Sequence, residues 1–459
     1  MKKVDFLFIY ETKARELENI CLLKYELEKR GYSVLFINTW YYLNKAAPKI
    51  DAHVVVAFAL YNNALYNFVN KYCCRIKKII NLQWEQIGTI ADEKNPLSAF
   101  FIKGFPQKAV HLAWGQKISD RLLSLGVNKR NIKVTGHIGM DFLNEKLLPY
   151  YMTREKLFKL YNIPPDKKVC LFISSFTSAD ISFADDSEDE KLGKTDIITQ
   201  NKKLSMIDFD KFIDISTLSK KYILEWIMEI LKKHEDLIFI YRPHPAEYIS
   251  DEFLSLTDTS ENFFIISEHS VKQWILSSDI ITTWYSTSLA EIFFAKKSCY
   301  ILRPVNIPFE MDLGIYENAE YITNYADFET VLDSKSYHFP VNETFIREYY
   351  TQNDKLNYIN ACDIFEEVLK DDSYKLPVFQ SFFRNLKNKI KYKLIYNRLT
   401  GFFAKLLKNR FHLFSLIYSR IYGNEYMQQM QKRNYATAEE IISIIDKIKI
   451  CLENKNNIN

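Results

Sequence analysis

Short runs of β-branched and aromatic residues alternate with helical patterns along the first third of the chain, and this alternation limits the fold more than any other feature. The runs are apolar without interruption, which is typical of parallel strands that are buried on both faces. Helical patterns at residues 14–30, 61–70 and 117–125 separate them. The runs are VDFLFIY, YSVLFIN, HVVVAF, KKIINLQ and NIKVTG. We therefore predict a Rossmann-like α/β domain over residues 1–150.

The same alternation begins again at residue 168, and helical patterns at 219–233, 271–276 and 288–295 separate its later runs. These runs are KVCLFISS, LIFIYR, FFIIS, DIITTW and SCYILR. We predict a second Rossmann-like domain over residues 151–370, and the length of 459 residues agrees with more than one core. Two such domains that face each other leave a cleft at the carboxyl ends of their strands, where open α/β sheets bind ligands.

Positive charge is concentrated near the C-terminus. Between Lys375 and Arg433 there are thirteen Lys or Arg residues and one acid, so this segment carries +12, and the rest of the chain carries −8 because the total is +4. Apolar residues interleave with the cations over residues 379–422, as in helices that lie on anionic membranes. We expect residues 371–459 to form a basic, amphipathic helical tail that docks on the inner membrane surface through 379–422. The alternative is that these helices pack back on the α/β domains.

Other features exclude several classes of protein. The first apolar run stops at Glu11, too early for a signal peptide, and no apolar stretch is long enough to span a membrane. The seven cysteines form no C-x-x-C pair, so we expect neither a zinc site nor a disulfide framework.

Without a signal peptide or membrane span, we expect a cytoplasmic protein. We expect no nucleic-acid partner, since no recognition motif accompanies the basic tail. The acidic stretch at residues 185–190 is interpreted as a solvated loop or a lid over the cleft, in preference to a metal site.

The segment YRPHPAE follows a predicted strand and holds Arg242 and His244 between prolines. At the carboxyl edge of a sheet, His244 can donate an N–H to a phosphate oxygen, and Arg242 can add a bidentate contact. Pro245, together with the proline before His244, restricts the loop and lowers the entropy that binding has to remove. The alternative is a structural histidine that caps the next helix.

A second candidate loop lies in SSDIITTWYSTSLAEI. Ser286 or Thr287 is expected to cap a helix whose N–H groups favour a phosphate, with Ser288 as a further hydroxyl donor. Glu291, one turn into that helix, can accept hydrogen bonds from a ribose. The alternative is a capping box that needs no ligand.

The first domain is expected to supply a base. Glu85, in NLQWEQIG, follows a strand and can deprotonate an acceptor hydroxyl. Further candidates for the cleft are Glu11, at the end of the first strand, and His137 with Asp141 in VTGHIGMD. A surface glutamate or a satisfied core histidine is the common alternative. Six of the eleven glycines fall between residues 88 and 139, and we expect them in loops that line the cleft or in ordinary turns.

The order of KVTGHIGMD, YRPHP and SSDIITTWYSTSLAEI resembles that of GT-B glycosyltransferases, and of bacterial surface-carbohydrate and capsule biosynthesis proteins in particular. The opening IYETKARELENICLLKYELEKRGYSV and NLQWEQ are similar to one such family, and the resemblance covers residues 1–370. It implies two facing Rossmann-like domains and a transferase that needs no metal or other cofactor. Its partners would be a nucleotide-activated sugar and a glycan or lipid-linked acceptor.

The same motifs resemble enzymes that use different classes of activated donor. In bacterial sialyltransferases and capsule Kdo transferases, a His-Pro motif holds the phosphate of a cytidine nucleotide and a Ser/Thr motif follows, as His244-Pro245 and Ser286 to Ser288 do here. Their acidic motif, two carboxylates before a glycine, is replaced by WEQIG with Glu85. CDP-glycerol glycerophosphotransferases resemble the chain at the His-Pro loop and at Asp279 and Tyr285-Ser286. The donor therefore stays open between CMP-, CDP- and UDP-linked compounds. Two further functions stay open as well, a nucleotide-sugar 2-epimerase and a non-catalytic scaffold for capsule assembly.

Overall fold

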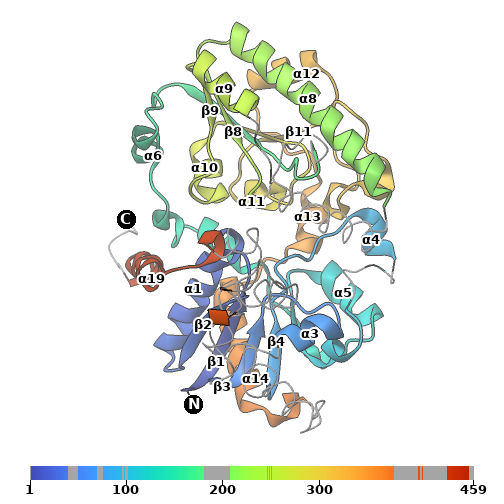
Figure 1. The fold of residues 1–459 in the computed structure, drawn as a ribbon, viewed down its shortest axis with the longest axis vertical. Helices are drawn as coiled ribbons and strands as arrows, with labels where there is room; N and C mark the ends of the chain where they lie inside the picture. The colour runs from blue at the N-terminus through green and yellow to red at the C-terminus, as the bar shows by residue number, and fades with distance from the viewer. Residues whose placement is uncertain are drawn as a thin grey trace.

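The structure is a computed structural model. It describes residues 2–39, 50–69, 76–95, 98, 102–179, 207–245, 247, 249, 251–376, 402–403, 406 and 432–453. The molecule has two α/β halves, one above the other in Figure 1, each built around its own parallel sheet. The predicted fold class is confirmed.

The first half contains a six-stranded sheet in the order β2-β1-β3-β4-β5-β6, and all of its pairings are parallel. β1 pairs with β2 on one side and with β3 on the other, so that Phe6 lies beside both Val34 and Val54. The strands are β1 (Lys2–Tyr10), β2 (Val34–Asn38), β3 (Ile50–Ala57), β4 (Lys78–Asn81), β5 (Val110–Ala113) and β6 (Ile132–Val134). The helices are α1 (Lys13–Lys29), α3 (Asn63–Val69), α4 (Ile90–Lys94) and α5 (Gln116–Ser124), and the short 3₁₀ helices are η1 (Phe105–Lys108), η2 (Lys129–Asn131), η3 (Ile138–Leu143) and η4 (Leu148–Tyr150).

The second half repeats this plan after α6 (Arg154–Leu160), with a parallel sheet in the order β12-β11-β10-β7-β8-β9. Its strands are β7 (Lys168–Ile173), β8 (Leu237–Arg242), β9 (Phe263–Ile265), β10 (Ile280–Thr283), β11 (Cys299–Leu302) and β12 (Tyr321–Ile322). Its helices are α8 (Phe209–Lys233), α9 (Asp251–Thr259), α10 (Val271–Ser277), α11 (Leu289–Phe294), α12 (Tyr325–Leu332) and α13 (Glu343–Tyr349), with 3₁₀ helices η5 (Phe309–Met311) and η6 (Gly314–Tyr316).

Uninterrupted apolar strands explain the two cores. Phe6, Leu7 and Phe8 are consecutive in β1, and none is more than 1% exposed, so both faces of the sheet are covered by other elements. Full burial of such a side chain contributes about 1.5–3 kcal/mol. One apolar cluster surrounds the first sheet, and two others cover the faces of the second.

The chain returns to the first half after α13. α14 (Asn357–Lys370), followed by the 3₁₀ helix η7 (Asp372–Tyr374), packs on the first sheet, where the ring of Phe365 lies 5.8 Å from those of Phe6 and Phe8. Figure 1 shows α14 beside the blue strands β3 and β4, at the end of the molecule away from the second sheet. The first half therefore includes residues 357–370, which we assigned to the second domain from their place in the sequence. The apolar face of α14 fits the first core, and a sequence pattern does not indicate which core such a face will join.

α19 (Ala438–Glu453) also packs on the first half, along α1. The Tyr25 hydroxyl donates to Glu453 (2.9 Å), and Lys13 pairs with Glu440 (2.7 Å). Most of the segment 379–422, for which we predict a membrane contact, lies outside the described residues. None of the helices in the described ranges is long and apolar enough to cross a bilayer.

Candidate functional site

The second sheet reverses its strand order at its central strands. β7 lies between β8 and β10, and the chain proceeds from it first to one side, through β8 and β9, and then to the other. In open α/β sheets this reversal marks the place where ligands bind. The His-Pro loop follows β8 and the Ser/Thr loop follows β10. The two predicted ligand-binding loops therefore emerge on either side of the same strand.

A buried carboxylate holds the His-Pro loop in place. Glu247 accepts hydrogen bonds from the backbone N–H of His244 (3.1 Å) and from the hydroxyls of Ser174 (2.6 Å) and Tyr241 (2.5 Å). Lys220 of α8 lies 3.6 Å from the same carboxylate, whose side chain is fully buried. Burial raises the pKa of Glu247, although Lys220 and the hydrogen bonds oppose this. Sequence reasoning did not single out Glu247, although it lies in the quoted YRPHPAE segment.

Arg242 has a different environment from the one we expected. Its guanidinium donates to the backbone carbonyls of Glu268 (2.8 Å) and His269 (2.5 Å), in the loop that follows β9. Burial lowers its pKa to about 10. These bonds tie two neighbouring loops together, so Arg242 has a structural role whether or not it also binds phosphate.

His244 and Pro245 are exposed at the tip of the loop. Part of the His244 residue reaches solvent. The protein around the ring nevertheless displaces much of its water, and this desolvation lowers the pKa of His244 to about 4. The charges of Arg433 and Arg15 act in the same direction, and Glu85 opposes them. At neutral pH the imidazole is therefore uncharged, with one N–H to donate and one nitrogen to accept.

The Ser/Thr loop is held by Tyr316. Its hydroxyl donates to the carbonyl of Ser286 and accepts the N–H of the same residue, both at 2.9 Å. The Ser286 hydroxyl accepts the N–H of Ser288 (3.2 Å), and Thr287 is exposed. The helix begins at Leu289 with Ser288 as its cap residue, so the predicted cap at Ser286 or Thr287 is wrong by one or two positions. The hydrogen bond from the Ser288 N–H to the Ser286 hydroxyl closes a turn over residues 286–288, so the helix begins only after this turn.

Glu291 lies where the two halves meet. Burial raises its pKa, and Lys272 opposes this shift. Its charge also acts on Tyr151 and Tyr350, which lie in the two segments where the chain crosses between the halves. A contact between Glu291 and a ribose remains a prediction.

Asp279, which matches part of a motif of CDP-glycerol transferases, lies at the opposite end of its strand. Its carboxylate accepts the N–H of Val169 (2.8 Å) and pairs with Arg154 (3.0 Å). Because this is the amino end of β10, Asp279 is remote from the loops at the carboxyl end. Tyr285, the other part of that motif, donates its hydroxyl to the carbonyl of Met311 (2.8 Å).

In the first half, three carboxylates surround one guanidinium at the carboxyl edge of the sheet. Arg15, in the first turn of α1, binds Glu85 and donates to Glu16 (2.9 Å), and Glu11 lies 3.9 Å away. The fully buried Glu16 accepts the N–H groups of Glu11 (2.9 Å) and Thr12 (3.1 Å) at the start of α1. Sequence reasoning found Glu11 and Glu85 but neither Arg15 nor Glu16, because the link from Arg15 to Glu85 spans 70 positions and the burial of Glu16 leaves no mark in the sequence.

A pocket of about 340 Å³ opens beside this cluster. Its walls include Glu11, Arg15, Tyr61, Trp84 and Glu85, at the carboxyl ends of β1, β3 and β4. Since β2 and β3 lie on opposite sides of β1, this is the point of strand reversal in the first sheet. The indole N–H of Trp84 is buried and finds no acceptor among the described residues. Burial and the nearby Glu16 raise the pKa of Glu11 to about 7.

Charges of the first half act on His244. The charge of Glu85 acts on its imidazole, and so does that of Arg15. His244 follows β8 of the second sheet and Glu85 follows β4 of the first, so these residues, 159 positions apart in the chain, belong to opposite halves and interact electrostatically. Their roles as donor-binding histidine and base stay predictions.

His137 is packed among aromatic rings. Its ring centroid lies 4.4 Å from that of Trp114 and 6.1 Å from that of Trp84, and its Nδ1 accepts the N–H of Gly139 (3.0 Å). Burial lowers its pKa to about 3, and Lys272 adds to this shift. These contacts match a neutral, structurally satisfied histidine, although the ring is separated from the pocket beside Glu85 only by Trp84.

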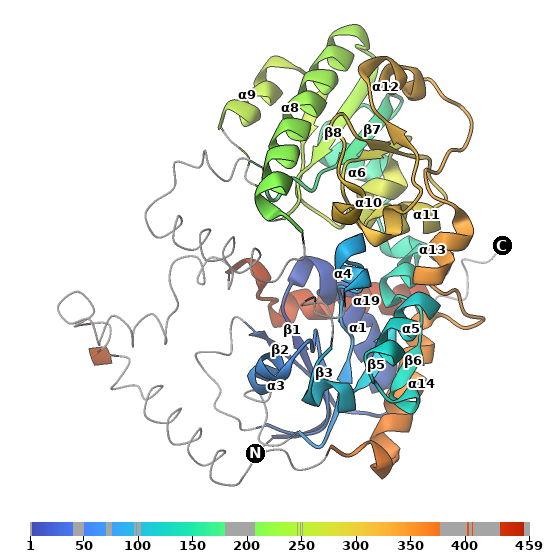
Figure 2. The ribbon, with the colours of Figure 1, turned by 90° about the vertical axis from the view of Figure 1, so that its right-hand side faces the viewer.

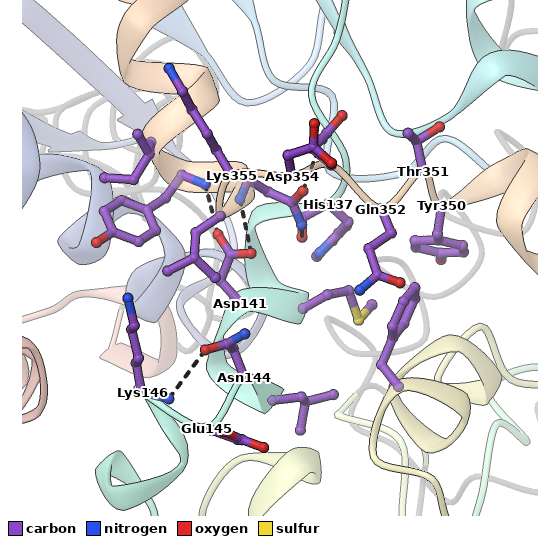
Figure 3. Close-up of a pocket in the computed structure, with 18 of the residues that line it drawn as sticks. His137, Asp141, Asn144, Glu145, Lys146, Tyr350, Thr351, Gln352, Asp354 and Lys355 are labelled. Atoms are coloured by element: carbon purple, nitrogen blue, oxygen red, sulfur yellow. Dashed lines mark hydrogen bonds between the residues drawn. The ribbon is translucent and has the colours of Figure 1, made fainter. Parts of the chain in front are cut away.

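Asp141 caps α14. Its carboxylate accepts the backbone N–H groups of Asn357 (3.0 Å) and Tyr358 (2.7 Å), as the dashed lines in Figure 3 show. Burial raises its pKa to about 7. His137 and Asp141 line a separate pocket of about 1190 Å³ between the halves, with Tyr350 and Lys355. This pocket shares no lining residue with the one beside Glu85.

The glycine-rich window contacts the part of the chain that follows residue 313. At Gly136, where φ is +76°, a Cβ would overlap Asn357, and at Gly115 it would overlap the backbone of Tyr349. Gly88 accepts the N–H of Gly314 (2.9 Å). These three glycines therefore allow the segment after residue 313 to approach the first half closely.

Metal-binding residues do not gather in the part of the chain that the structure describes: no three His, Cys, Asp or Glu residues there could hold an ion. The acidic stretch at 185–190 lies outside the described residues.

No protein-family model matches the chain, and no curated protein matches it. Among solved structures, the wall teichoic acid polymerase TagF matches with a TM-score of 0.51 at 13% identity, over 80% of this chain and 89% of that one. A second TagF structure gives 0.50 at 12% identity, over the same shares of the two chains. A UDP-GlcNAc 2-epimerase from Neisseria meningitidis bound to UDP-GlcNAc gives 0.47 at 14%, over 80% of this chain and all of that one.

Identities this low establish similarity of fold and nothing finer. The strand orders, the two halves and the likeness to TagF agree with one another. The chain therefore has a two-domain, GT-B-like α/β fold.

Proposed function

We propose that this protein is a glycosyltransferase that moves a sugar from a nucleotide-activated donor to a surface-polysaccharide or lipid-linked acceptor. The observation that carries the proposal is that the His-Pro and Ser/Thr loops follow β8 and β10, on either side of β7, where the strand order of the second sheet reverses. The charge of Glu85, from the first half, also acts on His244 of that loop. A fold of this type serves many activities, so the chemistry of these side chains decides between them.

The donor would bind to the second half. The neutral His244 imidazole donates its N–H to a donor phosphate, and the hydroxyls of Ser286, Thr287 and Ser288 supply further donors from the neighbouring loop. Glu247 and Tyr316 hold the two loops by direct hydrogen bonds to their backbones, so little conformational freedom is lost on binding. Glu291 would contact the ribose.

The acceptor would enter the pocket beside Glu85, whose volume of about 340 Å³ suits one or two small rings. Glu85 takes the proton of the acceptor hydroxyl as its oxygen bonds to the anomeric carbon of the donor sugar. The bond from that carbon to the phosphate oxygen breaks, and its electron pair leaves with the nucleotide. The N–H of His244 stabilises the charge that develops on this phosphate. Arg15 orients Glu85 for the reaction.

The test separates the two roles. Glu85→Gln is expected to keep nucleotide affinity and to lose sugar transfer, while His244→Ala is expected to lose both. Incubation of each candidate donor with membrane extract, followed by measurement of released nucleotide, gives the transfer rate. Glu235→Gln and His53→Ala are matched controls because both residues are exposed and outside the site. Transfer by Glu85→Gln at the wild-type rate removes Glu85 from the reaction. Conversion of the donor without acceptor indicates an epimerase instead.

We also propose that the protein works at the inner face of the plasma membrane. The cationic segment 379–422 would lie on anionic lipids and bring the site to a lipid-linked acceptor. Three of its residues are described, and all three are exposed apolar side chains in helical conformation: Phe402, Phe403 and Leu406. Exposed aromatic residues within a basic segment are typical of interfacial membrane helices.

A further inference from the structure

The chain returns to the cleft after the basic segment, and this return is anchored by hydrogen bonds. Asn434 is buried; its side chain accepts the N–H of Lys13 (3.1 Å), and its carbonyl accepts the Asn38 side chain (3.0 Å). The N–H of Ala436 donates to the hydroxyl of Tyr10 (3.1 Å). Tyr10 and Asn38 end β1 and β2, so residues 434–436 lie along the carboxyl edge of the first sheet.

This anchor carries Arg433 into the space between the halves. Both views show the start of the red C-terminal segment beside the amino end of α1, at the level where the two halves meet (Figures 1 and 2). Arg433 is exposed, and its charge acts on His244. The segment thus supplies a cation, held at the carboxyl edge of the first sheet by the anchor at Asn434 and Ala436, whose charge reaches His244 of the second half.

The two arginines near His244 differ in their partners. Arg15 is compensated by Glu11, Glu16 and Glu85. Arg433 forms no ion pair with any residue in the described ranges. A guanidinium whose charge reaches a neutral imidazole, and which has no carboxylate partner among the described residues, is matched by an anion with several oxygens, and phosphate fits its planar donors.

We propose that Arg433 is a substrate-binding residue that contacts the same donor phosphate as His244. Because this rests on the proposed function, Arg433 would close the phosphate site from the first half, opposite the His-Pro and Ser/Thr loops. The C-terminal segment would then form part of the binding site, with its position set by Asn434 and Ala436 and not by the second sheet.

The experiment is calorimetry of the full-length protein with CMP, CDP, UMP, UDP and GDP, repeated with cytidine, uridine and guanosine. Arg433→Ala is expected to lower the affinity for whichever nucleotide the wild type binds by about tenfold. This is a typical loss for one charge-assisted hydrogen bond. The corresponding nucleoside should bind the variant and the wild type equally, because it has no phosphate. Arg433→Lys should recover part of the affinity, since it keeps the charge but not the planar donors.

Lys432→Ala is the matched control, because Lys432 is the adjacent cation and is exposed. It should bind like wild type. Arg433→Ala keeps the side chain of Asn434 and the backbone of Ala436, and an unchanged melting temperature verifies that the anchor remains. Wild-type nucleotide affinity in Arg433→Ala, when His244→Ala has lost it, overturns this inference and leaves the proposed function intact. If the wild type binds no nucleotide, both proposals fall together.

Discussion

The carboxylate of Glu247 lies 3.1 Å from the backbone nitrogen of His244 and accepts its hydrogen bond. A buried acid three residues after the histidine thereby holds the loop that presents it. The same carboxylate joins the loop to Ser174, Tyr241 and Lys220 of neighbouring elements. The backbone of His244 is consequently held by a network in the second half.

Glu247→Gln should weaken both the loop and ligand binding. Tyr241 and Lys220 share one carboxylate oxygen, and Ser174 and the His244 N–H share the other. The amide keeps one of these two acceptors, so one pair of donors loses its partner, which should lower the free energy of unfolding by about 1–3 kcal/mol. We expect nucleotide affinity to fall about fivefold or more, since the loop that presents His244 loses its anchor. Calorimetry and urea denaturation measure the two effects, with the exposed Glu235→Gln as control. A loss of stability with unchanged nucleotide affinity would mean that Glu247 supports the fold without positioning His244.

Glu11 should make stability depend on pH in a definite direction. Its pKa is about 7 in the folded chain, whereas an unfolded glutamate titrates near 4.3. Between these values the folded state holds the proton more tightly, so the contribution of Glu11 to stability is present at acid pH and is lost as pH rises to 7. Glu11→Gln cannot lose a proton, so it should gain stability relative to wild type between pH 5 and 7. Denaturation at pH 5, 6 and 7 measures the difference, and a constant difference across this range would contradict the prediction.

Phe365→Ala should show that α14 is part of the first core. The ring of Phe365 is fully buried and contacts the rings of Phe6 and Phe8. Truncation of such a side chain costs about 3–5 kcal/mol. The free energy of unfolding from urea titration gives the value, and Tyr337→Ala, at a ring that is 58% exposed, should change it little. A cost below about 1 kcal/mol in Phe365→Ala would mean that the first half is stable without α14.

Replacement of Phe402, Phe403 and Leu406 by serine should reduce binding to anionic vesicles. These side chains are 47–64% exposed, so the change should leave the melting temperature unaltered. Co-sedimentation with phosphatidylglycerol vesicles at low and high salt measures the effect, and phosphatidylcholine vesicles test the requirement for negative charge. Leu160→Ser, at a leucine that is 62% exposed on α6, is the matched control. Equal vesicle binding by the triple variant and wild type would remove these residues from the membrane contact.

The strands and helices around the two sheets were largely predictable from sequence, because short, uninterrupted apolar runs are typical of parallel strands that are buried on both faces. The predicted helix at 14–30 corresponds to Lys13–Lys29, and that at 117–125 to Gln116–Ser124. The helix predicted from residue 219 begins ten residues earlier, at Phe209, where Asp208 accepts the N–H of Lys211. Two strands were not predicted, β5 (Val110–Ala113) and β12. β12 has only two residues, and its pairing with β11 alone defines it.

The site was predictable only in part. His244 and Ser286 follow β8 and β10, which flank β7 in one parallel sheet, so the topology explains why their loops are neighbours. Arg15 and Glu247 contact partners about 70 positions away, which no local pattern reveals. Asp141 was singled out for its chemistry, but its two backbone partners in α14 explain it as a helix cap.

The assignment of the cleft to a nucleotide-activated donor is decided by a calorimetric titration of wild type, His244→Ala and His53→Ala with CMP, CDP, UMP, UDP and GDP. We expect one nucleotide to bind selectively and His53→Ala to leave its affinity unchanged. His244→Ala should weaken that nucleotide at least about tenfold, the loss of one hydrogen bond to a charged phosphate. Equal affinity in wild type and His244→Ala, or binding of no nucleotide by the wild type, would contradict the assignment.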